Sequence, residues 1–335
     1  MIKIDIDLKV LEVSVGKALG RQVILKPLKV KCTYPVFVGV NGRDGVPPPS
    51  AGVEKKVFVK VGLMSEWEQT RKVNSAIGDC DLIPKLLVTE PIEYRGYAVF
   101  VTEWREGKIV YPEDFNEAQL KSFVDGCVRL SEVLNSEKFK AAFPLDELPP
   151  MTSDYGVINQ FRKRFPVMAK TFGRLLKISS ERRIARGANR AIIHGDFHAK
   201  NFSFIGDKLT TVYDFDKLGI GYKCGDVINA LGERFSLLSM SKKKQARLIA
   251  VTRRILAMLP WSGSEMYWTS ISLRLRFAAS RIRKHPNLPL IALDVRRRDK
   301  GLFILTCLIQ EVFKNEISQP TNEIMRAHKL QTTND

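Results

Sequence analysis

The sequence predicts an α+β protein with a small antiparallel sheet in its N-terminal third and a mainly helical remainder. Two observations support this prediction. Residues 1–104 hold short β-type runs that Gly and Pro interrupt, whereas after them apolar side chains recur at helical spacing. A chain of 335 residues is long enough to bury a core in each of two lobes. We therefore expect an N-lobe over 1–104, a helical C-lobe over 105–317 and a polar tail over 318–335.

The N-lobe is expected to contain one helix and five strands. The helix is placed at about Ser65–Ile77, because Ser65 and Glu68 have the spacing of a reciprocal N-terminal cap. Arg95-Gly96 is typical of a hairpin turn. The expected strands are Val23–Val30, Pro35–Val40, Val57–Val61, Lys85–Thr89 and Tyr97–Trp104.

The C-lobe is expected to begin with an amphipathic helix over Asn116–Leu134, whose apolar residues form one stripe. Tyr155–Ile178 repeats the helical pattern despite Pro166, which should kink or split it. Helical patterns resume after Asp226 and continue to about Glu316.

Cysteine usage and hydropathy predict a cytoplasmic protein. The five cysteines are scattered, without a C-x-x-C pair, which argues against a disulfide framework or a zinc site. The N-terminus lacks the apolar core of a signal peptide. The longest apolar runs fall far short of the roughly 20 residues that a membrane span needs.

The net charge of +18 is concentrated in one region. Residues 241–300 contain 15 Lys and Arg against 3 Asp and Glu, a net +12. This excess indicates either an anionic partner or solvated helix faces. The partner would be an acidic substrate, nucleic acid, or an anionic surface at the inner face of the membrane. A nucleic-acid partner is disfavoured because the chain contains no known nucleic-acid-binding motif. The sequence does not predict an oligomeric state.

The stretch His194–Asp216 carries the strongest chemical signal. Asp196 is followed by Asn201 five positions later and by Asp214 thirteen positions after that. Phosphoryl transfer from a magnesium nucleotide uses one carboxylate to accept the proton of the attacking hydroxyl, and an amide oxygen with a second carboxylate to hold the metal. The spacing matches the kinase pattern D-x-x-x-x-N followed by D-F-x. The sequence thus predicts a phosphotransferase that uses ATP and Mg2+.

Lys60 is the candidate for contacting the nucleotide phosphates, because it lies inside a predicted strand upstream of this motif. Its carboxylate partner would be Glu66 or Glu68 of the following helix, and we favour Glu68. If the kinase interpretation holds, the adenine ring bonds to backbone near Thr102–Trp104, where Trp104 either stacks on the ring or covers the hinge.

A glycine-rich phosphate-binding loop is not evident, because no G-x-G-x-x-G precedes Lys60. Val15–Gly20 and Gly39–Gly45 are each either such a loop or a plain turn. We assign no residue to this function.

The run His194–Asn201, the triplet Asp214-Phe215-Asp216 and the later Asp226 resemble the aminoglycoside phosphotransferase/choline kinase branch of the protein-kinase-like superfamily. The order of elements is also similar to that of lipopolysaccharide core sugar kinases. The resemblance implies a two-lobe protein-kinase-like fold and specific roles. Those roles are catalytic base for Asp196, magnesium ligands for Asn201 and Asp214, phosphate contact for Lys60 with Glu68 or Glu66, loop packing for His194, and hydrogen bonds to loop backbone for Asp226.

Three further residues of the motif have two interpretations each. His198 either faces the substrate or fills the loop. Lys200 either neutralises charge on the γ-phosphate or is simply solvated. Asp216 either assists the metal or lies at the surface.

The basic region disfavours a polycationic aminoglycoside as the acceptor and favours a neutral or anionic one. We expect phosphate transfer to a hydroxyl of a small molecule or glycan, such as a phosphorylated sugar or a sugar acid. One alternative is a pseudokinase or binding scaffold with a basic surface for an anionic partner. Another is a protein kinase, which Gly195 in place of Arg and the lack of an A-P-E-like segment disfavour.

Overall fold

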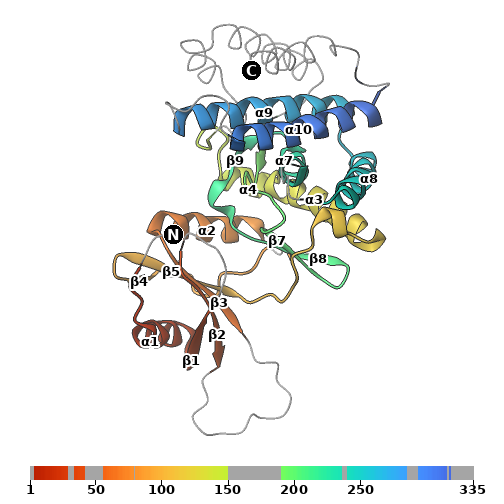
Figure 1. Ribbon diagram of the computed structural model, residues 1–335. Helices are drawn as coiled ribbons and strands as arrows, with labels where there is room; N and C mark the ends of the chain where they lie inside the picture. Colours follow the sequence, from red (N-terminus) through yellow and green to blue (C-terminus); the bar gives the residue numbers. More distant parts are fainter. Residues whose placement is uncertain are drawn as a thin grey trace. The chain divides into compact units, whose positions relative to one another are not determined.

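The protein is represented by a computed structural model that describes residues 4–28, 34–41, 56–78, 80–149, 190–235, 240–284, 293–314 and 317. The chain divides into two compact units (Figure 1). The N-terminal unit comprises Met1–Lys108 with Thr210–Asp216, and the C-terminal unit comprises Ile109–Leu209 with Lys217–Asp335. An antiparallel sheet in the first and helices in the second confirm the predicted α+β class.

The N-terminal unit is built on an antiparallel sheet of five strands in the order β1-β2-β3-β5-β4. Arg95-Gly96 forms the predicted hairpin turn between the last two strands, with positive φ at both residues. The strands are β1 (Val23–Pro27), β2 (Val36–Asn41), β3 (Val57–Gly62), β4 (Ile92–Tyr94) and β5 (Tyr97–Glu103).

Two helices, α1 (Leu8–Leu19) and α2 (Met64–Ile77), cover opposite faces of this sheet. Strand side chains alternate between faces. Val99 and Val101 of β5 therefore join a core that includes Leu11 of α1, whereas Ala98 and Phe100 pack with Trp67 of α2. Lys60 of β3 is paired with Phe100, so the register places the lysine on the α2 face.

The structure corrects several sequence predictions here. The α1 helix was not expected, and it contains most of Val15–Gly20, with Gly20 as its left-handed C-cap. That candidate phosphate loop is therefore a helix end. Gly39–Asn41 of the other candidate lie in β2, and its remainder falls outside the described residues.

Two element boundaries are also corrected. Lys85–Thr89 is not a strand, because only Leu86 forms an isolated bridge, to Thr102. The α2 helix starts at Met64, after Leu63 as an N-cap without a side-chain hydrogen bond. Ser65 thus lies inside the helix, and the expected cap between Ser65 and Glu68 is wrong.

The C-terminal unit is mainly helical. The predicted helix Asn116–Leu134 is confirmed as α3 (Glu117–Leu134), with Asn116 and Gln119 forming a reciprocal cap. Tyr155–Ile178 and the tail 318–335 lie outside the described residues. The other helices are α4 (Glu137–Ala142), α7 (Gly225–Phe235), α8 (Lys242–Met258), α9 (Gly263–Lys284) and α10 (Leu293–Val312), with 3-10 turns η1 (Pro112–Asp114) and η2 (Phe215–Lys217).

Four short strands lie in the second half of the chain. They are β6 (Ala191–Ile193), β7 (Phe202–Ile205), β8 (Lys208–Val212) and β9 (Gly219–Gly221), which pair as β6–β9 and β7–β8. Helices α9 and α10 lie side by side and pack on α7 (Figure 1). None of the helices in the described part of the chain combines the length and apolar composition of a membrane span.

Candidate active site

Lys60 lies among three carboxylates in the N-terminal unit. Its Nζ is 3.3 Å from Oε2 of Glu66, 3.0 Å from Oδ2 of Asp216 and 3.9 Å from Oδ1 of Asp214. The ammonium also lies 5.2 Å from the ring centroid of Phe100. Burial lowers the pKa of Lys60, but the three carboxylates outweigh it and the net shift is upward. The lysine therefore stays charged.

The partner of Lys60 is Glu66 and not the favoured Glu68, which is exposed. Residues two positions apart on a helix do not share a face. Because α2 turns Trp67 into the core, Glu66 reaches back toward β3 and Glu68 projects to solvent.

The segment Asp214-Phe215-Asp216 is held against α2 in the same unit. Gln69 Nε2 donates a 2.6 Å hydrogen bond to the carbonyl of Phe215, whose ring is buried. Asp214 has φ +66°, a left-handed conformation that non-glycine residues rarely adopt and that recurs at functional sites. This geometry fixes both aspartates beside Lys60.

Asp216 is the closest of the three carboxylates to Lys60 and is mostly buried, with 23% of its side chain exposed. Burial and the neighbouring Asp214 raise the pKa of Asp216 to about 6, although Lys60 opposes the shift. When all three carboxylates are ionised, they exceed the single charge of Lys60 by two. The carboxylate oxygens of Asp214 and Asp216 are of the type that Mg2+ prefers, but the described residues hold no group of three or more His, Cys, Asp or Glu side chains arranged to bind a metal ion.

The predicted hinge residues Thr102 and Trp104 lie at the end of β5 and just after it. The indole Nε1 of Trp104 is buried without a hydrogen-bond partner among the described residues. Next to it, Arg105 donates to the carbonyl oxygens of Ile83 at 3.2 Å and Thr210 at 3.1 Å, and also to that of Asp81. Arg105 thereby ties the end of β5 to β8, a role that the sequence did not reveal.

The predicted catalytic loop follows β6 in the C-terminal unit, and Asp226 at the start of α7 supports it. The Asp226 carboxylate accepts the backbone N–H of His194 at 2.8 Å and that of Gly195 at 3.0 Å. Burial raises the pKa of Asp226, while His194 and the two N–H groups lower it in part. The expectation that Asp226 bonds to loop backbone is confirmed.

His194 is fully buried and lies edge-on to Phe197, with ring centroids 5.9 Å apart. Its Nδ1 accepts the N–H of Asp196 at 3.3 Å, which confirms the loop-packing role. His198 acts similarly, because its Nδ1 accepts the N–H of Lys200 at 3.2 Å. Lys200 itself is exposed.

Asp196 and Asn201 are joined within this loop. Asn201 Nδ2 donates to the carbonyl of Asp196 at 2.9 Å, which leaves its amide oxygen as the group available to a cation. The Asp196 carboxylate accepts a 2.6 Å hydrogen bond from Nζ of Lys217. Sequence analysis missed Lys217, whose only signal is its position directly after the Asp214–Asp216 triplet.

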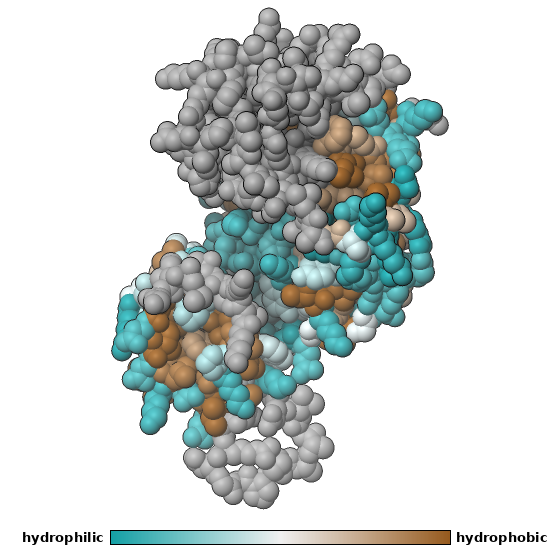
Figure 2. Space-filling view, in the orientation of Figure 1, coloured by the Kyte–Doolittle hydropathy of each residue, from teal (hydrophilic) through white to brown (hydrophobic). Residues whose placement is uncertain are grey.

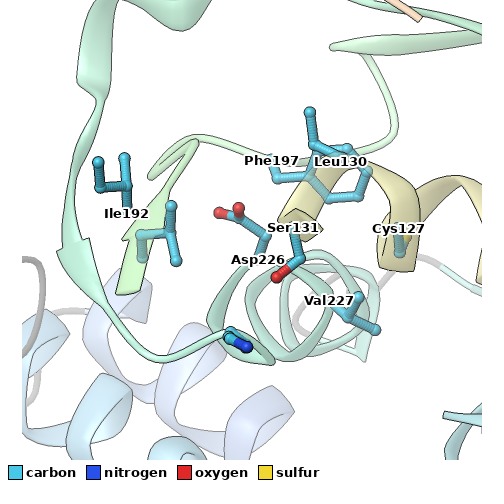
Figure 3. Close-up of a pocket in the computed structure, with 9 residues that line it drawn as sticks. Cys127, Leu130, Ser131, Ile192, Phe197, Asp226 and Val227 are labelled. Atoms are coloured by element: carbon cyan, nitrogen blue, oxygen red, sulfur yellow. The ribbon is translucent and has the colours of Figure 1, made fainter. Parts of the chain in front are cut away.

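Strand β6 is fixed from both sides. Its Ile192 pairs with Ile220 of β9. On the other side, the Asn135 side chain accepts the Ile192 N–H at 2.9 Å and donates to the Ile192 carbonyl at 3.0 Å. A small pocket lies behind the loop (Figure 3), where Asp226 is surrounded by side chains that include Cys127, Ser131, Ile192 and Phe197.

Part of the basic charge is neutralised within the C-terminal unit. On α8, Lys244 pairs with Asp114 at 3.6 Å, Arg253 pairs with Glu311 at 2.9 Å, and Arg254 pairs with Glu117. The face seen in Figure 2 is largely hydrophilic over α8. The side chains of residues 274–302, which carry much of the remaining charge, are outside the described set.

Solved structures with the same fold include proteins described as aminoglycoside phosphotransferases. A Ralstonia eutropha JMP134 protein assigned to that group is 12% identical with a TM-score of 0.58, over 93% of this chain and 99% of its own. A thermostable mutant of aminoglycoside phosphotransferase APH(4)-Ia, solved in a ternary complex with ADP and hygromycin B, is 12% identical with a TM-score of 0.50, over 89% and 98%. Spectinomycin phosphotransferase APH(9)-Ia, solved with ADP and spectinomycin, is 10% identical with a TM-score of 0.51, over 97% and 98%.

No curated protein sequence matches the chain significantly. The sequence model of the phosphotransferase enzyme family, however, matches residues 75–254, which is more than half of the 335 residues. The match begins in the last turn of α2 and includes the loop after β6, the Asp214–Asp216 segment and Asp226. Sequence and fold agree, and the chain belongs to the phosphotransferase enzyme family.

Proposed function

We propose that this phosphotransferase transfers the γ-phosphate of ATP, bound with Mg2+, to a hydroxyl of a small molecule or glycan. The grouping of Lys60 with Glu66, Asp214 and Asp216 carries the proposal. A lysine held by a helix carboxylate beside an aspartate pair provides both a phosphate contact and oxygen ligands for a metal.

Each of the candidate site residues has a defined task in this proposal. When bound, magnesium ATP would supply the phosphoryl group together with a cation that neutralises its developing charge. Asp214 and the amide oxygen of Asn201 would hold the metal, and Lys60, kept in place by Glu66, would donate to phosphate oxygens. Asp196 orients the acceptor hydroxyl and accepts its proton. Backbone near Thr102 and Trp104 binds the adenine ring.

A small-molecule acceptor is supported by the neighbours, since hygromycin B and spectinomycin are small molecules. The net charge of +18 supports a neutral or anionic acceptor over a polycationic one. It also supports contact between the basic region and an anionic membrane surface. We place the reaction in the cytoplasm, which the free thiols Cys80, Cys127, Cys224 and Cys307 support.

The test is a thermal-shift titration with ATP and Mg2+, together and singly, followed by γ-phosphate transfer to a panel. The panel holds a neutral sugar, a sugar acid, a phosphorylated sugar and an aminoglycoside. We expect stabilisation that requires both ATP and Mg2+, its loss in Asp214→Ala, and transfer that is lost in Asp196→Ala. Asp125→Ala is the matched control, because Asp125 forms an exposed pair with Lys121 on α3.

A wild-type protein that is indifferent to magnesium ATP refutes the proposal. Salt-sensitive binding of an anionic partner that survives Asp196→Ala, with no phosphate transfer, would instead identify a binding scaffold. Transfer to a protein substrate would identify a protein kinase.

A further inference from the structure

A lysine that follows the Asp214–Asp216 segment contacts the proposed base directly. Lys217 Nζ lies 2.6 Å from Oδ2 of Asp196. The Lys217 side chain is 60% exposed and that of Asp196 is 27% exposed. The contact is a short, charge-assisted hydrogen bond at an accessible place on the C-terminal unit.

The contact divides the two oxygens of Asp196 between different tasks. Oδ2 is held by Lys217, and the backbone of Asp196 is fixed by His194 and Asn201. Oδ1 is then the oxygen left to face an acceptor hydroxyl. An ammonium has three N–H donors, so Lys217 keeps two donors after it bonds to Asp196.

We propose that Lys217 positions Asp196 for proton transfer and supplies the cation that stabilises the phosphoryl group during its transfer. The proposal rests on the function proposed above. It assigns to Lys217 the charge-neutralising role that the sequence suggested for Lys200, which lies exposed on the loop.

The reaction balances without a further reagent. The acceptor oxygen forms a bond to the γ-phosphorus of ATP, and the bond from that phosphorus to the β,γ-bridging oxygen breaks, so that ADP leaves with the electron pair. The hydroxyl proton passes to Oδ1 of Asp196, which later releases it to water. Lys217 transfers no proton in this step and stabilises negative charge on the transferred group.

The test compares wild type with Lys217→Met, Lys217→Arg and Lys121→Met. Lys121 is a matched control, because it forms an exposed 2.7 Å pair with Asp125 on the same unit. The measurements are magnesium-ATP hydrolysis with water as the acceptor, the Kd for magnesium ATP, and the Kd for magnesium ADP with and without fluoroaluminate. Fluoroaluminate mimics the transferred phosphoryl group, so its binding reports on transition-state stabilisation without the natural acceptor.

We expect Lys217→Met to lower kcat by about 10- to 100-fold while its Kd for magnesium ATP stays within about twofold of wild type. The factor by which fluoroaluminate tightens binding of magnesium ADP should also be about tenfold smaller in Lys217→Met than in wild type. Lys217→Arg, which keeps the charge, should restore most of both properties, and Lys121→Met should match wild type. A merely structural role for Lys217 would change the melting temperature and not separate kcat from Kd.

Two negative results are distinguishable. A Lys217→Met protein with wild-type hydrolysis and wild-type fluoroaluminate affinity overturns this inference alone. A wild-type protein that fails to bind magnesium ATP overturns the proposed function and the inference with it. Where hydrolysis by wild type is too slow to measure, the fluoroaluminate comparison decides.

Discussion

Lys60 and Glu66, whose charged groups lie 3.3 Å apart, come from consecutive elements that only Leu63 separates. The short connection requires the helix carboxylate to fold back over the strand end, and Gly62 makes this possible. A Cβ at Gly62 would lie 2.9 Å from Oε2 of Glu66 and 3.0 Å from the Phe100 ring. The sequence of this turn therefore determines which carboxylate the lysine meets.

Glu66→Gln should weaken binding of magnesium ATP by several-fold, because Lys60 loses the partner that holds it toward the phosphates. Lys60→Met should weaken binding by about tenfold or more, since a charged phosphate contact is lost. The matched control is Glu68→Gln on the exposed side of α2, which should bind like wild type. Isothermal titration with magnesium ATP measures all three, and a Glu68 variant as weak as the Glu66 variant would contradict this pairing.

Asp226→Asn should loosen the catalytic loop, because the amide has one acceptor oxygen for the two N–H groups that the carboxylate binds. We expect magnesium-ATP turnover to fall by about tenfold. A variant that keeps full turnover would show that the loop holds its shape without this carboxylate.

The same variant has a distinctive pH dependence. Burial raises the folded-state pKa of Asp226 above its unfolded value near 4. An acid with a raised pKa contributes stability when protonated and loses it as pH rises from about 4 through the folded pKa. Asn at position 226 does not titrate, so the variant does not lose stability in this way. The melting temperature of wild type minus that of Asp226→Asn should therefore decrease as pH rises from 4 toward 7. Melting curves in one buffer series at constant ionic strength test this sign.

Asn135→Ala should destabilise the C-terminal unit, because it leaves the N–H and carbonyl of Ile192 without their side-chain partners. Unsatisfied buried backbone groups cost about 1–3 kcal/mol in the free energy of unfolding. Urea denaturation measures the change. Asn135→Asp, which can accept a hydrogen bond but not donate one, should recover part of the lost free energy of unfolding. Equal stability of Asn135→Ala and wild type would mean that water replaces both hydrogen bonds.

Glu113 and Arg234 form a buried ion pair between η1 and α7, with side chains 1% and 12% exposed, and the guanidinium lies 4.0 Å from the ring centroid of Tyr111. Arg234→Met should cost about 3–5 kcal/mol, because it strands a buried carboxylate. Adding Glu113→Gln should recover part of that loss. The exposed pair of Arg254 and Glu117 serves as the comparison: Arg254→Met should not change stability measurably.

The local packing of the loop after β6 could be predicted from the sequence, because its residues contact one another over short separations. The hydrogen bond from the Asp196 N–H to His194 spans two positions, and the one from Asn201 to the Asp196 carbonyl spans five, so the motif itself contains the geometry. The strand Val57–Val61 and the Arg95-Gly96 hairpin were predictable for the same reason, since alternation and turn residues are local signals.

The features that sequence analysis missed depend on contacts between distant parts of the chain. From the sequence, Glu66 and Glu68 are equally suitable partners for Lys60. The packing of Trp67 fixes the rotation of α2 and so determines which of the two faces the lysine. Lys217 meets Asp196 across 21 positions, and Asn135 meets Ile192 across 57. The helix α1 was missed because its apolar residues were interpreted without the sheet face that they cover.

The left-handed backbone of Asp214 lowers stability at a position that the proposed activity requires. Left-handed geometry costs an L-residue about 1–2 kcal/mol, and Asp214 adds a second negative charge beside Asp216. Asp214→Gly would relieve both costs and remove the proposed metal ligand. Selection for thermal stability alone would therefore favour loss of this proposed metal ligand, and an engineered variant should be stabilised elsewhere.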